Sequence, residues 1–147
     1  MIYKPEKLEI VINKLSKLYD LKNVKDLFIL LPQILEQVEV RAMAFGVVGG
    51  IAKKKAAINV LSGISKINTA RVSKKLLSIL IDTIVNASKG YYTINDRKDV
   101  INIASTIVEQ NSLNLDKKFL TVFINTIIDA SKGYYAINKV KKEYYEN

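Results

Sequence analysis

The chain contains no Cys, His or Trp among its 147 residues. Disulfides, thiol nucleophiles, imidazole bases and zinc sites built on Cys or His are therefore excluded by inventory. The sequence also lacks a Gly-rich phosphate loop and a Ser-centred nucleophile motif. Because these absences remove most familiar catalytic designs, we expect a protein that is not an enzyme, with no catalytic residues, no metal site and no cofactor.

Long apolar runs are also scarce. The most apolar stretch, residues 42–52, has 11 residues, whereas a membrane-spanning helix needs roughly 20. Lys and Glu side chains interrupt the first ten residues, which is not typical of a secretory signal. We therefore expect no membrane span and a cytoplasmic location.

A duplicated stretch of 22 residues is the most prominent feature that is present. Residues 74–95 recur 43 positions later as residues 117–138, and 14 of the 22 aligned positions are identical. A weaker similarity upstream extends the duplication to helix-pair units of approximately 53–95 and 96–138. Two units are fewer than the roughly three that an open solenoid needs, so we expect them to close into one bundle within a single helical domain, residues 1–147.

Apolar residues recur at three- and four-residue intervals along most of the chain, which predicts amphipathic helices. The first helix begins at Pro5 and runs to about residue 20, and a second begins after Asn23. Pro32 removes one backbone hydrogen bond, so we expect a kink or short break near Leu31. Glycines within residues 46–50 indicate either a turn, which we favour, or a face where another backbone comes close. The fold predicted is all-α, a helical bundle of about five or six helices.

Helix ends are also predicted. Ser73 is expected to cap the first repeat helix and Asn95 the helix between the copies. The last helix is expected to continue past residue 138. The helical spacing places the first tyrosine of each copy on the buried face, together with its aliphatic neighbours. In the two copies this face consists of Leu77, Leu80, Ile81, Ile84 and Tyr91, and of Leu120, Phe123, Ile124, Ile127 and Tyr134.

The sequence Ala-Ser-Lys-Gly-Tyr-Tyr occurs at residues 87–92 and again at residues 130–135. In one interpretation the glycine permits close packing or ends a helix, and the tyrosines fill core and rim positions. In the other, the tyrosines stack on bases while Lys89 and Lys132 contact phosphate. We favour the packing interpretation.

Carboxylates occur in pairs that share a helix face, which a metal site or an acid–base site would require. For Glu36 with Glu39 we favour a place on an exposed face. Asp96 and its neighbour three residues later are better explained as first-turn acids. Asp82 and Asn86 have counterparts in the second copy with acid and amide exchanged. This exchange predicts either a polar contact across the two repeat helices or a solvated edge.

The formal net charge of +9 is unevenly distributed. Between Glu39 and Asp82 there are eight basic residues and no acidic one, which suggests a polyanionic partner. The alternative is a solvated basic face. We predict that this segment contacts an RNA or DNA backbone, because affinity for phosphate grows with the number of cations presented together. The predicted nucleic-acid contacts are Lys53, Lys54, Lys55, Lys66, Arg71, Lys74 and Lys75.

Leu31-Pro32 is followed by the apolar segment Arg41-Ala-Met-Ala-Phe45. With these landmarks, residues 31–55 resemble the small helical subunit of type III CRISPR effector complexes. The resemblance implies a non-catalytic subunit that lines a filament and contacts guide or target backbone through Lys and Arg. We therefore expect a non-enzymatic basic subunit of a nucleoprotein assembly that contacts nucleic acid without sequence specificity.

Two other functions are compatible with a basic helical chain that lacks catalytic residues. One is a self-assembling, helical-bundle coat protein of an archaeal virus, which would be located in the virion. The other is an inhibitor that docks on a nucleic-acid enzyme. Both involve protein partners or self-association, and neither requires a catalytic constellation.

Overall fold

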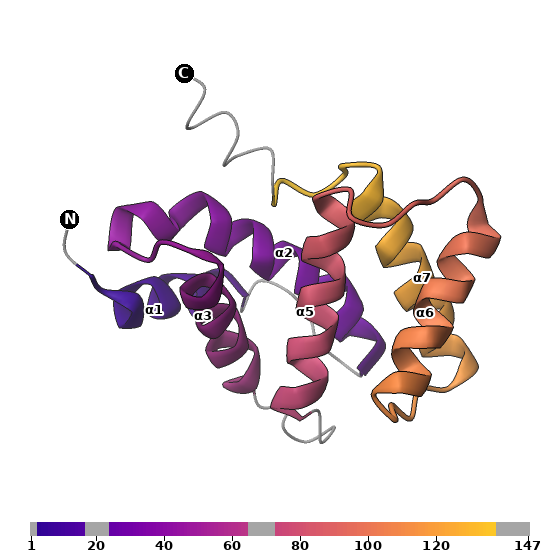
Figure 1. The fold of residues 1–147 in the computed structure, drawn as a ribbon. Helices are drawn as coiled ribbons and strands as arrows, with labels where there is room; N and C mark the ends of the chain where they lie inside the picture. Colours follow the sequence, from indigo (N-terminus) through magenta and orange to yellow (C-terminus); the bar gives the residue numbers. More distant parts are fainter. Residues whose placement is uncertain (1–2, 17–23, 65–72, 138–147) are drawn as a thin grey trace.

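The computed structural model describes residues 3–16, 24–64 and 73–137, which form helices and no strand (Figure 1). There are six α-helices and one short 3-10 helix in these ranges, so the predicted all-α bundle is confirmed. In chain order the elements are α1 (Pro5–Ser16), α2 (Val24–Arg41), η1 (Ala42–Phe45), α3 (Gly50–Ser62), α5 (Lys74–Ser88), α6 (Arg97–Gln110) and α7 (Lys117–Ser131).

Helix α2 lies at the centre of the bundle, in contact with α1, α3, α5 and α7. It continues through Pro32 for 18 residues, so of the two outcomes predicted near Leu31 the break is wrong, and the kink stays a prediction. Leu31 and Ile34 are both fully buried, and this packing offsets the hydrogen bond that Pro32 cannot donate. No helix in the described ranges is long and apolar enough to cross a membrane.

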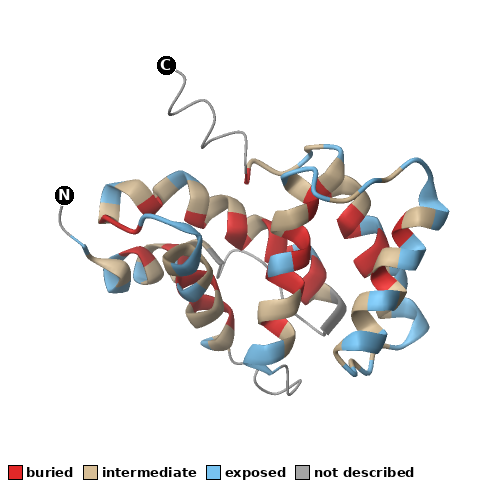
Figure 2. Cartoon of the chain, viewed as in Figure 1, coloured by how far each residue is buried: buried red, intermediate tan, exposed pale blue. Residues whose placement is uncertain are grey.

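The core is one continuous cluster to which all six α-helices contribute, and Figure 2 shows the buried residues on the sides of the helices that face one another. Its largest members are aromatic. The ring centroid of Phe28 on α2 lies 6.4 Å from that of Phe119 and 6.0 Å from that of Phe123, both on α7. Such offset pairs add to the stabilisation that apolar burial provides.

A turn connects η1 to α3, as the glycine cluster predicts. Gly46 and Gly49 both have positive φ angles, 73° and 89°. The N–H of Lys4, just before α1, donates a hydrogen bond of 2.7 Å to the carbonyl oxygen of Phe45. The N-terminal helix is thereby fixed beside this turn.

The two repeat helices have equivalent ends. The bounds of α7 lie 43 residues after those of α5 at both ends, and the two helices pack side by side and run in the same direction (Figure 1). The Ser73 hydroxyl accepts a hydrogen bond from the N–H of Leu76, which confirms the predicted cap. Asp116 caps α7 in the same way.

Helix α6, between the copies, begins with a capping box. Its N-cap is Asp96 rather than the predicted Asn95, and the Asp96 carboxylate accepts a hydrogen bond from the N–H of Asp99. The Asp99 carboxylate in turn accepts hydrogen bonds from the N–H groups of Asn95 and Asp96. The pair is therefore a helix-capping device, as the first-turn interpretation proposed.

Candidate nucleic-acid interface

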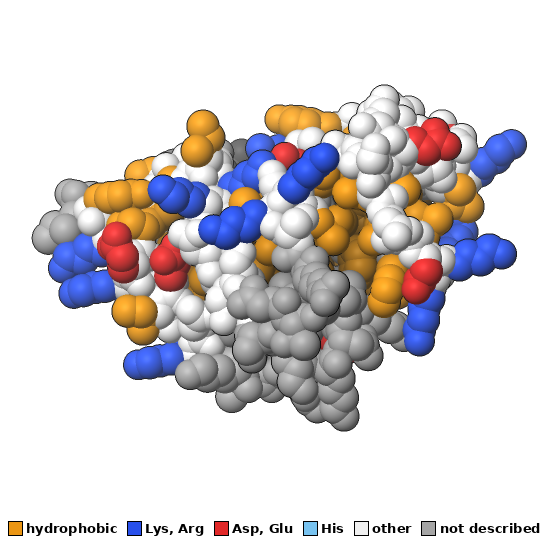
Figure 3. Space-filling model, turned by 90° about the horizontal axis from the view of Figure 1, so that it is seen from below, with side chains coloured by type: hydrophobic (Ala, Val, Ile, Leu, Met, Phe, Trp, Pro, Cys, Tyr) orange, Lys and Arg blue, Asp and Glu red, His pale blue; other side chains and the backbone are white. Residues whose placement is uncertain are grey.

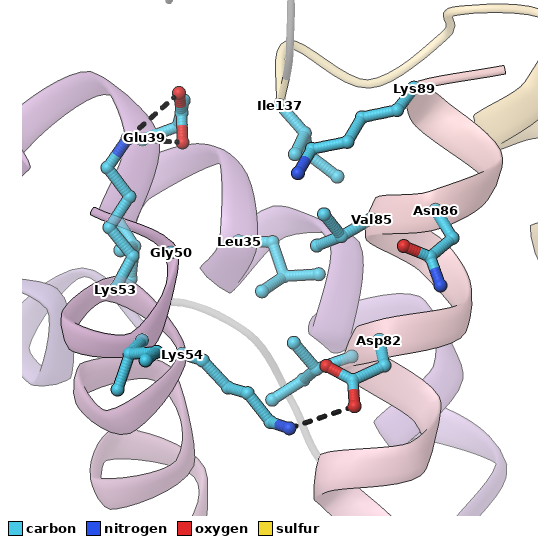
Figure 4. Close-up of a pocket in the computed structure, with 13 residues that line it drawn as sticks. Leu35, Glu39, Gly50, Lys53, Lys54, Asp82, Val85, Asn86, Lys89 and Ile137 are labelled. Carbon is cyan, nitrogen blue, oxygen red and sulfur yellow. Dashed lines mark hydrogen bonds and ion pairs between the residues drawn. The ribbon is translucent and has the colours of Figure 1, made fainter. Parts of the chain in front are cut away.

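Two lysines of the predicted basic segment have acidic partners (Figure 4). Lys53 Nζ lies 3.2 Å from both carboxylate oxygens of Glu39, and Lys54 Nζ lies 2.9 Å from Asp82 Oδ2. Glu39 and Asp82 are the two acids that bound the acid-free segment in the sequence. The segment is therefore partly neutralised in space, and of this run Lys55 is the exposed member without an ion pair among the described residues.

The other predicted contacts lie elsewhere. Lys74 and Lys75 are exposed and begin α5. They are separated along the helix pair from Lys54, which contacts Asp82 in the middle of α5. Lys66 and Arg71 lie outside the described residues. The structure does not gather the predicted residues that it describes into one patch.

A basic group that the sequence prediction omitted lies at the start of α7. Lys117 and Lys118 are the 43-residue counterparts of Lys74 and Lys75, and all four are exposed. Because α5 and α7 run in the same direction, the four lysines lie at the same end of the bundle, and neither helix has an acid in its first turn. In the described part of the chain no carboxylate pairs with any of them. The 43-residue spacing of the duplication could have identified this group from the sequence, because it relates Lys117 and Lys118 to Lys74 and Lys75.

Cations at the start of a helix oppose the helix dipole, whose positive end lies there. We call Lys74, Lys75, Lys117 and Lys118 the four-lysine group. Their positive charges are locally unfavourable for helix stability. An anion bound there would be attracted both by the lysine side chains and by the positive end of the helix dipole. Figure 3 shows that other Lys and Arg side chains are spread over the face seen from below, with fewer acidic ones between them.

The Lys-Gly-Tyr segments end α5 and α7 in a Schellman motif. The N–H of Tyr91 donates a 3.0 Å hydrogen bond to the carbonyl of Asn86, and the N–H of Gly90 donates one of 3.0 Å to the carbonyl of Ala87. The second copy repeats both hydrogen bonds at equal lengths. Gly90 and Gly133 have φ angles of 74° and 77°, which only glycine adopts at little cost. Their predicted role as helix ends is confirmed, and α7 ends at Ser131 instead of continuing past residue 138.

The tyrosines of each pair differ in exposure. Tyr91 and Tyr134 are 67% and 66% exposed, so their predicted place on the buried face is wrong. The positive-φ glycine reverses the chain, so helical spacing no longer applies beyond it. The second tyrosines, Tyr92 and Tyr135, pack against the core instead.

A lysine ammonium group lies over the ring of each exposed tyrosine. Lys89 Nζ is 5.7 Å from the ring centroid of Tyr91, and Lys132 Nζ is 5.8 Å from that of Tyr134. These cation–π pairs place a cation and an aromatic face together at the C-terminal ends of two adjacent helices. The geometry is compatible with the base-stacking interpretation, because in each Tyr-Tyr sequence the ring of the first tyrosine is exposed to solvent.

Asp82 and its counterpart Asn125 make equivalent contacts within their own copies. Lys54 donates to Asp82, and Arg97, 43 residues after Lys54, donates a 2.9 Å hydrogen bond to Asn125. Each contact joins the two helices of one unit. The predicted polar contact across α5 and α7 is therefore absent from these residues.

The Glu36/Glu39 pair does not lie on an exposed face. Glu39 binds Lys53, and Glu36 accepts a 3.0 Å hydrogen bond from the N–H of Ala136.

Burial, followed by the negative charges of Asp129 and Glu36, raises the pKa of the Tyr135 phenol to about 12. The described residues contain no cluster of three or more acidic side chains that would hold a metal ion.

No protein-family model matches this chain, and neither a curated protein nor a solved structure matches it.

Proposed function

We propose that this chain is a non-enzymatic, basic helical subunit of a nucleoprotein assembly that binds RNA or DNA backbone without sequence specificity. The observation that supports the proposal best is the four-lysine group. The duplication repeats two exposed lysines at the starts of two adjacent, parallel helices, with no carboxylate bound to them in the described residues.

The energetic argument concerns phosphate. Two lysines at each helix start are unfavourable in the free protein, and the Asp116 carboxylate at the N-cap offsets only part of this at α7. A bound phosphate relieves the remaining repulsion while it accepts hydrogen bonds from N–H groups at the helix start. Contacts of this kind position a backbone but carry no sequence information. The resemblance of residues 31–55 to the small subunit of type III CRISPR effectors is compatible with such a role.

The Lys53–Lys55 run contributes less than the sequence suggested. Lys53 and Lys54 must exchange Glu39 and Asp82 for phosphate before they add to binding. Lys55, Lys74 and Lys75 are available without such an exchange. We therefore assign the main backbone contacts to the four-lysine group.

The test compares two variants that lose the same charge. One replaces the four-lysine group with Gln, and the other replaces the exposed Lys7, Lys14, Arg97 and Lys98, none of which is a predicted nucleic-acid contact, with Gln. Affinity for a labelled 20-nucleotide poly-U RNA and for a 20-base-pair DNA duplex is measured by fluorescence anisotropy between 50 and 300 mM KCl. The slope of log K against log salt reports the number of phosphate contacts, roughly 0.7 to 0.9 per contact.

We expect the first variant to lose a slope of roughly 3, with each lost contact contributing as above, and the second to lose much less. Circular dichroism checks that both variants keep the helical content of the unmodified chain. Equal losses in the two variants would show that general charge, not this group, binds the backbone. An unmodified chain that binds neither nucleic acid at 50 mM KCl would refute the proposed function.

A second candidate, a self-assembling coat protein, is favoured by exposed apolar residues around the turn between α2 and α3. Val40, Val48 and Ile51 are 51%, 54% and 89% exposed. Single exposed apolar residues are ordinary, but several together indicate a protein contact. Sedimentation velocity in the absence of nucleic acid distinguishes the two functions. Polymerisation that rises with protein concentration and is reduced in Val48→Ser would favour the coat protein.

A further inference from the structure

A pocket lies between α2, α3 and α5 (Figure 4), and none of the four lysines at the helix starts lines it. Its volume is about 370 Å³, within the range of roughly 300 to 1,000 Å³ that is usual for small-molecule sites. Two ion pairs hold its walls together. Lys53–Glu39 joins α3 to α2, and Lys54–Asp82 joins α3 to α5.

The pocket has one apolar side and one polar rim. The aliphatic side chains come from α2, α3 and α5 and from the last described residue. They are Leu35, Val38, Ile51, Ile81, Val85 and Ile137. The rim carries Lys53, Lys54, Lys89 and the Asn86 side chain. A ligand with one apolar part and one polar part would therefore place each part against a different side of the cavity.

The charges of the rim do not cancel. Glu39 neutralises Lys53 and Asp82 neutralises Lys54, whereas Lys89 has no carboxylate partner in the described residues. Three cations and two anions leave one positive charge. Figure 4 shows Lys89 extending from the end of α5 toward Ile137, and the Tyr91 ring lies 5.7 Å from its ammonium group. The Asn86 side-chain amide makes no hydrogen bond to another described residue, so it is available as a donor.

We propose that this pocket binds a small amphiphilic anion, a molecule with an apolar body and one negatively charged head group. The aliphatic wall takes the body, and Lys89 Nζ together with the Asn86 amide holds the head group. Glu39 and Asp82 select against a second negative charge, because they lie on the same rim. The four-lysine group does not line this site, whereas Lys53 and Lys54 of its rim are among the nucleic-acid contacts predicted from the sequence. The proposed binding of the anion does not depend on nucleic acid.

The test uses two probes of similar shape. One is 8-anilino-1-naphthalenesulfonate, which has an apolar body and one sulfonate, and the other is the uncharged N-phenyl-1-naphthylamine. Fluorescence titration without nucleic acid gives a Kd for each, so failure here is distinguishable from failure of the proposed function. We expect Lys89→Gln to raise the Kd of the sulfonate about tenfold, the loss of one charged hydrogen bond, and to leave that of the neutral probe unchanged.

The duplication supplies a matched control. Lys132 is the 43-residue counterpart of Lys89 and also lies over a tyrosine ring, but it does not line the pocket. Lys132→Gln should leave both Kd values unchanged. If it weakens sulfonate binding as much as Lys89→Gln does, the proposal is wrong, because the effect is then one of general charge.

A second variant tests the apolar wall. Val85→Phe should obstruct the cavity with a larger side chain and weaken binding of both probes, whereas Ile128→Phe at the counterpart position in α7 should not. Binding that survives both Lys89→Gln and Val85→Phe but falls in Val48→Ser would place the probe on the exposed apolar turn. That result would overturn the proposal.

Discussion

Helices α5 and α7 carry the same sequence plan but meet different neighbours. Their bounds, their N-caps, their Schellman ends and their Lys–Tyr pairs agree between the copies. Yet α7 packs against the Phe28 ring of α2, whereas α5 packs against α3 and lines the pocket. Similar local sequence therefore produces the same local conformation in both copies. The elements that pack against each copy differ, so the two helices have different contacts.

The positions at which the copies differ reflect those surroundings. Leu80 in the first copy corresponds to Phe123 in the second, and both are fully buried. Val85, which lines the pocket, corresponds to the larger Ile128. The second copy thus fills its volume with rings and longer aliphatic chains, and the first leaves a cavity beside α3.

We expect the largest effect from a substitution that breaks the aromatic cluster of the second copy. Phe123→Ala should lower the free energy of unfolding by about 3–5 kcal/mol, because it removes a fully buried ring and leaves a cavity beside Phe28. Phe123→Leu restores the residue of the first copy and should cost much less. Urea unfolding followed by circular dichroism measures both. Equal costs for the two variants would mean that the ring contact itself is unimportant.

A smaller effect tests whether the two helix ends are equivalent. Gly90→Ala and Gly133→Ala should each lower the free energy of unfolding by about 1–2 kcal/mol, because an L residue is disfavoured at positive φ. An added Cβ at Gly90 meets no atom within 4 Å, so there the cost comes from the backbone alone. Gly50→Ala is the control, since Gly50 begins α3 with equally open space around it. We expect no loss of stability in that variant, and clearly unequal losses at residues 90 and 133 would contradict the equivalence.

We expect the smallest effect from substitutions that exchange the polar contacts of the two copies. Asp82→Asn converts the Lys54 ion pair into the neutral contact found at Asn125, and should cost about 0.2–1 kcal/mol because both partners are partly exposed. The cost should vanish in 1 M KCl, where exposed charges are screened. The reciprocal change, Asn125→Asp, should add a salt-sensitive ion pair with Arg97. A cost for Asp82→Asn that does not depend on salt would show that charge is not the reason for the contact.

Much of the fold follows from periodicity and helix-end chemistry in the sequence. The apolar spacing predicts the helices, Ser73 predicts the start of α5, and the glycines predict the turn before α3. The break considered at Pro32 does not occur, because tertiary packing around α2 outweighs the single hydrogen bond that proline removes. The exposure of Tyr91 also escaped prediction, since it depends on the chain reversal at Gly90.

The candidate interface was less predictable than the fold. The sequence shows that no acid lies between Glu39 and Asp82, but it does not show that these two acids bind Lys53 and Lys54. Charge balance on a surface depends on which helices pack together, and that information is not local. The duplication was the better guide, because it pairs the lysines that begin α5 with those that begin α7.

The hydrogen bond from Ala136 to Glu36 joins residues that are 100 positions apart. It connects the central helix to the segment after the last repeat helix, so it closes a loop that encloses most of the bundle. Closing so long a loop has a high entropic cost unless the intervening helices are already docked. The Ala136 amide proton is therefore a natural reporter of complete assembly, one whose slow exchange with solvent would require both copies and α2 to be in place together.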